Sequence, residues 1–308
     1  MQSVSNNLNL PLIEEDTKLP LVISVVLKYW GEENLLAESS RFKSLISIHD
    51  SLKIAEKNDF CFYIYKGSLV DIKKRIDQGI PPIVIFPGLY DLIQHAMLIS
   101  GYDKEEKRIL TYIPRPDTEG FIPESKFESE WEQEDNITII LLPNDMKNII
   151  KRNTLPCLDS NMICFEAEID FLVGNFDSAI EKLNKALVNE PENAHAWSIL
   201  GSCYSEKNIS EAVICFNKAI SINSRYYLAF RGLGNYYLKN RDYEKSEKYY
   251  SSAIEIDPNR YGPIYKNRAF VRLNQNKNKL AKEDLILYLQ KTPDAYDKNQ
   301  VRETIDNL

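Results

Sequence analysis

The fold of the second half of this chain follows from AFRGLGNYYLK (residues 229–239) and the adjoining YEKSEKYYSSAIEIDP (243–258). Similar sequences occur before and after it, as FDSAIEKLNKALVNEP (176–191), ISEAVICFNKAISINS (209–224) and, more loosely, KLAKEDLILYLQKTPD (279–294). The matching last positions recur after 33, 34 and 35 residues, at Pro191, Ser224, Pro258 and Pro293. An internal period of this length predicts stacked pairs of helices.

These repeats carry small and aromatic residues at fixed positions. Small residues recur where paired helices would cross, at Ala179 and Ala186, Ala212 and Ala219, and Ser246 and Ala253. An aromatic-Leu-Gly-Tyr pattern occurs at Trp197, Leu200, Gly201 and Tyr204, and again at Phe230, Leu233, Gly234 and Tyr237. The pattern resembles the tetratricopeptide repeat. This resemblance implies an all-α solenoid of about four repeats over residues 151–308, closed by a capping helix within 295–308.

Residues 1–150 mix helix and strand signals instead. LPLVISVVLKYWG (19–31) predicts a buried helix, since it is shorter than the roughly 20 apolar residues that cross a bilayer. Further helices are predicted over 34–48 and 68–78. Strands are predicted at 61–65, 82–86, 95–101, 108–113 and 136–142. Short, turn-rich links between the strands indicate an α+β domain with an antiparallel sheet.

The ordered segments of residues 9–143 resemble bacterial C39-type cysteine peptidases, which have a papain-like fold. The similar segments are LPLVISVVLKYWG, PPIVIF, HAMLISGYD, ILTYIPRP and FIPESKFESEW. Aligned on this family, Lys18 stands where the nucleophilic cysteine is expected and Ile113 where the orienting aspartate is expected, whereas His95 is retained. A solvated lysine is protonated near neutral pH and is no nucleophile. The resemblance therefore implies a pseudopeptidase that keeps the fold and loses the catalytic residues.

Two other interpretations of the N-terminal domain remain open. Cys61 could serve as an unforeseen nucleophile in an active peptidase, although its apolar strand favours a packing role. The domain could also be purely structural and cap the repeats. His95 has no second ligand at metal-binding spacing, so neither a metal nor a cofactor is expected.

First helices of tetratricopeptide repeats line a concave groove that can bind a peptide. By repeat register, the predicted groove residues are His195, Arg231, Asn235, Lys239, Lys266 and Asn267. Three of them resemble part of a carboxylate clamp, in which basic and amide groups hold a peptide's C-terminal carboxylate: Arg231, Asn235 and Asn267. A solvated polar groove is the alternative interpretation.

The composition of the chain argues against some classes of binding partner. The net charge of −7 argues against general binding to nucleic acid or anionic membranes. Residues 1–16 show no signal-peptide pattern, and the five cysteines lack metal-ligand spacing, so a cytoplasmic protein with reduced thiols is expected. The sequence thus predicts a non-catalytic scaffold that binds another protein or a peptide segment. It predicts no oligomeric state.

Overall fold

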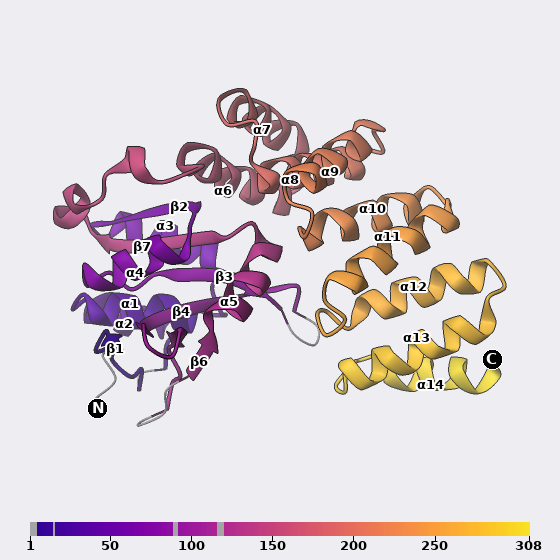
Figure 1. The fold of residues 1–308 in the computed structure, drawn as a ribbon, viewed down its shortest axis with the longest axis horizontal. Coiled ribbons are helices and arrows are strands. Elements are labelled where there is room, and N and C mark those ends of the chain that lie inside the picture. Colours follow the sequence, from indigo (N-terminus) through magenta and orange to yellow (C-terminus); the bar gives the residue numbers. More distant parts are fainter. Residues whose placement is uncertain (1–4, 15, 89–91, 116–119) are drawn as a thin grey trace. The chain divides into compact units, whose positions relative to one another are not determined.

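The computed structural model describes residues 5–14, 16–88, 92–115 and 120–308 (Figure 1). The chain forms two compact units. The first comprises Met1–Ile85, Ala96–Trp131 and Asn136–Phe165, and the second comprises Phe86–His95, Glu132–Asp135 and Glu166–Leu308. The helix α6 (Leu158–Leu172) contributes residues to both units. Two short segments from the first half of the sequence therefore belong with the repeats.

The first half of the chain has the predicted α+β composition. Its helices are α1 (Leu21–Tyr29), α2 (Glu33–Ser39), α3 (Ile48–Lys57), α4 (Leu69–Asp77) and α5 (Glu124–Trp131). Its strands are β1 (Ser5–Asn7), β2 (Phe60–Lys66), β3 (Ile83–Pro87), β4 (Gln94–Asp103), β5 (Arg108–Thr111), β6 (Gly120–Pro123) and β7 (Ile137–Pro143). Among the described residues the sheet order is β2-β7-β3-β4-β5-β6, with β1 on β4, and every pair whose register is defined is antiparallel. Short 3-10 helices occur at Glu132–Glu134, Asn144–Ile149 and Arg152–Thr154.

Helix α1 is buried, as its apolar sequence predicts. Every residue from Val22 to Leu27 is at most 9% exposed. The helix ends at Tyr29 with Trp30 as its C-terminal cap, and Gly31 then adopts φ 84°, which favours glycine. The Trp30 indole N–H donates to the Leu141 carbonyl at 3.0 Å and fixes the end of the helix against β7. Helix α1 is therefore part of the core of the first unit.

The predicted helix over 34–48 is wrong in extent. Helix α2 ends at Ser39, and α3, which the sequence did not indicate, begins at Ile48. The serine hydroxyls of Ser39 and Ser40 donate to the carbonyls of the preceding turn at 2.7 Å, which competes with continued helix. Ser47 then caps α3 by accepting from the Asp50 amide at 3.0 Å.

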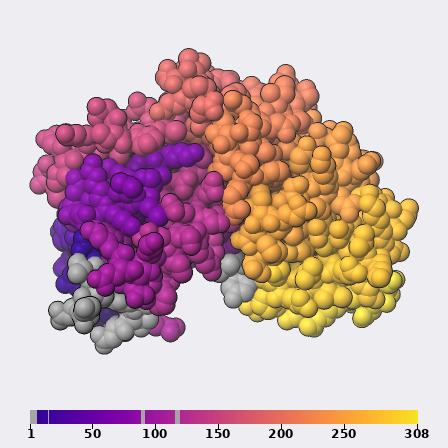
Figure 2. All heavy atoms as spheres, in the orientation of Figure 1, coloured from indigo at the N-terminus to yellow at the C-terminus, as the bar shows by residue number. Residues whose placement is uncertain are grey.

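The second unit is an array of helix pairs. Its further helices are α7 (Phe176–Asn189), α8 (Ala194–Glu206), α9 (Glu211–Ile222), α10 (Tyr227–Lys239), α11 (Tyr243–Ile256), α12 (Pro263–Asn274), α13 (Asn278–Lys291) and α14 (Lys298–Asn307). Consecutive helices pack in the pairs α8 with α9, α10 with α11 and α12 with α13. In Figure 2 the orange and yellow helices α10 to α14 pack as one continuous body. Helix α14 occupies the position of the predicted capping helix.

The glycines of the repeat pattern lie where a side chain would collide with a ring of the paired helix. A Cβ on Gly201 would lie 2.9 Å from the Phe216 ring, and one on Gly234 would lie 2.5 Å from the Tyr250 ring. Both rings are almost fully buried. The sequence pattern therefore reflects close packing between the two helices of one repeat.

Candidate functional site

The described helices include none that is both long enough and apolar enough to cross a membrane. The candidate site lies instead on α10 and α12 of the second unit. Arg231 is half-buried, with its guanidinium 5.1 Å from the centre of the Tyr261 ring. Within the described parts of the chain, no carboxylate lies at ion-pair distance from Arg231. Asn235, one turn further along α10, accepts a 2.7 Å hydrogen bond from the Tyr250 hydroxyl. Arg231 thus offers an uncompensated cation to an anionic group.

Lys266 and Asn267 line a cavity of about 880 Å³ beside the last helix pair. The other lining residues are Tyr261, Pro263, Tyr288, Thr292, Pro293, Asp294, Ala295 and Tyr296. The sequence placed Lys266 and Asn267 at groove positions but gave no indication that α13 and the turn after it would close the cavity. Its walls combine aromatic rings with a few polar groups, as ligand sites usually do.

Two charged side chains line this cavity among the described residues: Lys266, which pairs with Asp297, and Asp294. The Lys266 ammonium lies 2.8 Å from Asp297 and 5.0 Å from the centre of the Tyr288 ring. Burial lowers the pKa of Lys266, but the hydrogen bond to Asp297 and the charges of Asp297 and of the nearby tyrosines together outweigh it, so the net shift of the pKa is upward. The Thr292 hydroxyl is buried and has no hydrogen-bond partner in the described residues. A bound polar group could satisfy this hydroxyl.

Two other predicted groove residues, His195 and Lys239, contact neighbouring parts of the repeat array. His195 is 7% exposed, with its Nδ1 3.0 Å from the Tyr226 hydroxyl and its Nε2 3.3 Å from Glu168. Burial lowers the pKa of His195, but Glu168 and two further carboxylates outweigh it and raise the pKa overall. Lys239 donates to the carbonyls of Ser205 and Glu206 at the end of α8. His195 thus contacts α6 and the N-terminal cap of α10, whereas Lys239 contacts the end of α8.

A buried ion pair in the second unit was not indicated by the sequence. Arg260 and Glu134 are both 0% exposed and pair with each other. The Gln94 amide also donates to Glu134, and Arg260 donates to the Ile93 carbonyl at 3.0 Å. Arg260 additionally lies 3.9 Å from the centre of the Tyr227 ring. Burial raises the pKa of Glu134 despite the neighbouring arginine.

The positions aligned with peptidase residues are distributed over both units. Lys18 belongs to the first unit and pairs with Asp16 at 3.0 Å. Ile113 follows β5, where its side chain lies beside Gly120. His95 belongs to the second unit, packs on the Phe86 ring, and has a pKa lowered by burial. The papain-like comparison therefore stays a prediction.

Cys61 lies on β2, and its contacts are those of a residue that packs in the sheet. Its thiol contacts the Leu142 carbonyl at 3.6 Å, and burial raises its pKa, which disfavours the reactive thiolate. The described residues also hold no group of three or more His, Cys, Asp or Glu side chains arranged for a metal ion.

Comparisons with known proteins concern the repeats. Residues 173–226 and 227–260 each match a family model described as tetratricopeptide repeat. Anaphase-promoting complex subunit 3 of Schizosaccharomyces pombe is 29% identical over 83 residues, which cover 27% of this chain and 12% of that protein. Human cilia- and flagella-associated protein 70 is 33% identical over 96 residues, which cover 30% of this chain and 9% of that protein.

Solved structures with similar helices include a thermophilic tetratricopeptide-repeat protein of Thermus thermophilus, with a TM-score of 0.43 and 16% identity over 49% of this chain and 82% of that one. Another is PilF of Pseudomonas aeruginosa, with a TM-score of 0.43 and 20% identity. The match covers 48% of this chain and 67% of that one. The two matched relatives, the anaphase-promoting complex subunit and the cilia- and flagella-associated protein, are much longer, and this chain spans about a tenth of the length of each. The C-terminal part of the chain contains tetratricopeptide repeats.

Proposed function

We propose that this chain is a protein-binding scaffold whose repeats hold a peptide segment of another protein. The observation that carries this proposal is the cavity of about 880 Å³ beside Lys266 and Asn267. Its volume lies within the range of about 300–1,000 Å³ that is typical of ligand sites. One relative with similar repeats is named as a subunit of a complex, which supports a role in assembly.

The proposed ligand is an acidic peptide because of Arg231, which lies outside the cavity lining but against the lining residue Tyr261. Arg231 has no ion-pair partner among the described residues, so a peptide carboxylate would meet a free guanidinium there. Asn267 would donate an amide hydrogen to the same peptide from the next repeat. Lys266 already pairs with Asp297, so a ligand carboxylate would share or replace this partner. Hydrogen bonds between charged groups are the strongest that such a site can offer.

We expect the double variant Arg231→Ala/Asn267→Ala to bind acidic peptides at least about tenfold more weakly, because one charge-assisted hydrogen bond contributes about 1.5–3 kcal/mol. The measurement is titration of the full chain with acidic hexapeptides that end in a free or an amidated C-terminus. Lys239→Ala is the matched control, since among the described residues the Lys239 ammonium bonds to two α8 carbonyls and pairs with Glu206. Unchanged affinity in the double variant, or no binding of any peptide, would contradict the proposal.

We also propose that the N-terminal unit performs no acyl transfer. Lys18 cannot supply a thiolate, and the raised pKa of Cys61 disfavours that thiol as a substitute. We expect an acylating cysteine-protease probe to label the wild-type chain no faster than it labels Cys61→Ala, as followed by intact-mass spectrometry. Rapid, stoichiometric labelling that disappears in Cys61→Ala would instead establish an active cysteine enzyme.

A further inference from the structure

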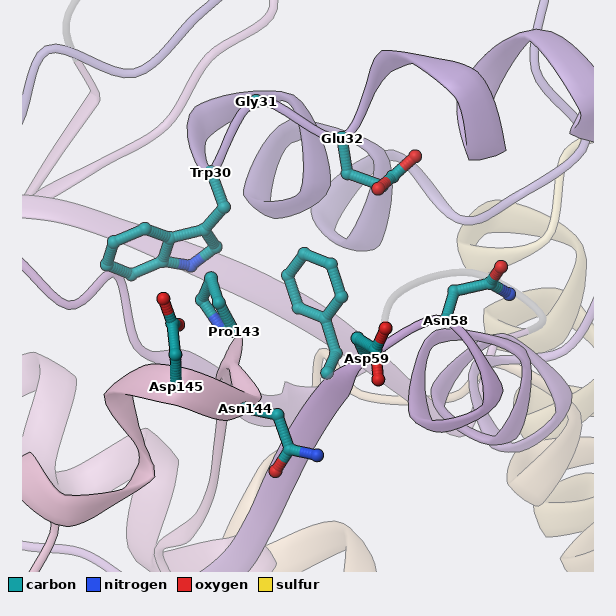
Figure 3. A pocket seen from close by; sticks show the side chains of 9 residues that line it. Trp30, Gly31, Glu32, Asn58, Asp59, Pro143, Asn144 and Asp145 are labelled. Atoms are coloured by element: carbon teal, nitrogen blue, oxygen red, sulfur yellow. The ribbon is translucent and has the colours of Figure 1, made fainter.

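A second cavity, of about 480 Å³, lies in the first unit (Figure 3). It is assembled from turns that are distant in sequence. Trp30 and Glu32 come from the link between α1 and α2, Asn58 and Asp59 from the end of α3, and Asp145 from the turn after β7. None of its lining residues belongs to the repeats or is one of the aligned catalytic positions Lys18, His95 and Ile113.

The charged side chains that line this cavity are acidic. Three carboxylates line it, from Glu32, Asp59 and Asp145, and among the described residues no lysine or arginine does. In the described parts of the chain, neither Asp59 nor Asp145 has an ion-pair partner. Helices α1 and α3 both end at the cavity, since Trp30 and Asn58 are their C-terminal caps. A helix C-terminus carries partial negative charge, so both helices add to the field of Asp59 and Asp145. Glu32 differs, because it caps the N-terminus of α2 by accepting from the Leu35 amide at 3.0 Å.

Aromatic side chains also line the cavity, beside the carboxylates. In Figure 3 the Asp145 carboxylate points toward the ring of Trp30. The hydrogen bond from the indole to Leu141 holds that ring in place at 3.0 Å. Phe60, which is 5% exposed, contributes a second ring. Fixed aromatic faces attract organic cations through their quadrupole.

We propose that this cavity binds an organic cation, namely an ammonium or guanidinium group on a short apolar stem. The carboxylates would neutralise the charge while the Trp30 ring packs against the stem and the cationic group. The volume is far larger than a bare metal ion requires, and it matches a small ligand or one basic side chain. This proposal is independent of peptide binding by the repeats.

The direct test uses N-acetylarginine amide and its neutral isostere N-acetylcitrulline amide. The chain has three tryptophans, so its indole N–H groups give a simple nitrogen-15 NMR spectrum in which Trp30→Phe assigns the Trp30 signal. We expect the arginine compound to shift the Trp30 signal selectively and to bind at least about fivefold more tightly than the citrulline compound. Equal binding of both compounds, or no shift of the Trp30 signal, would overturn the proposal.

The carboxylates are tested by the double variant Asp59→Asn/Asp145→Asn. Asn tolerates the φ of 63° at position 59, so this change preserves the backbone. We expect about tenfold weaker binding of N-acetylarginine amide, because each exposed ion pair contributes up to about fivefold. Glu38→Gln is the control, because it removes one charge from an exposed site on α2 outside the cavity. Wild-type affinity in the double variant would contradict the proposal.

The source of the cation is distinguished by one further probe. An acetylated and amidated Gly-Arg-Gly peptide carries the same guanidinium within a polypeptide. Tighter binding of this peptide than of N-acetylarginine amide would support a basic segment of a protein as the ligand. Equal binding would support a free small cation. Failure of both probes would overturn the site without affecting the acidic-peptide proposal for the repeats.

Discussion

Arg260→Ala is expected to lower the free energy of unfolding of the second unit by about 3–5 kcal/mol, since it leaves the buried Glu134 carboxylate without its partner. Both side chains are 0% exposed, so water does not replace the lost interaction. The substitution also removes the donor to the Ile93 carbonyl. Urea denaturation followed by circular dichroism measures the change as a lower midpoint at constant slope.

The control for this prediction is the exposed ion pair between Arg225 and Glu132 in the same unit. Their side chains are 38% and 51% exposed, and their charged atoms are 3.5 Å apart. Arg225→Ala should therefore change stability by no more than about 1 kcal/mol. A double variant, Arg260→Met/Glu134→Leu, should be less destabilised than Arg260→Ala, because it leaves no buried charge. If Arg260→Ala is as mild as Arg225→Ala, the burial argument is wrong.

The repeats could be predicted from the sequence because their determinants are local. A period near 34 residues, small residues at helix crossings and prolines after helix ends all act within one or two neighbouring repeats. Helices α9, α11 and α13 end two residues before Ser224, Pro258 and Pro293 respectively. Proline lacks the amide that a continuing helix requires.

Features formed by distant segments could not be predicted in the same way. The Arg260–Glu134 pair joins two turns with no shared sequence pattern. The cavity at Trp30 depends on three separate links, which follow α1, α3 and β7. The surroundings of the predicted groove residues also depend on distant segments: Lys266 and Asn267 lie beside residues that follow α13, and His195 contacts Glu168 and Tyr226. The repeat register predicts which face of a helix a residue lies on, but it does not predict which side chains of neighbouring helices contact that residue.

Tyr250→Ala is expected to destabilise the second unit by about 3–5 kcal/mol, as truncation of a fully buried aromatic side chain typically does. Tyr250 is 0% exposed and packs against Gly234 of the paired helix. The Tyr250 ring fills the space beside Gly234, so its removal would leave a cavity between α10 and α11. The measurement is again the free energy of unfolding in urea.

Two matched variants separate the ring from its hydroxyl and from the glycine. Tyr250→Phe keeps the ring but removes the hydrogen bond to Asn235, so it should cost about 1 kcal/mol. Gly234→Ala keeps the ring but places a Cβ 2.5 Å from it, so overpacking should cost about 1–3 kcal/mol. In the Tyr250→Ala background the same Gly234→Ala change has no ring to meet, and its cost should fall. An unchanged cost in that background would show that Gly234 is required by the helix backbone and not by the packing of Tyr250.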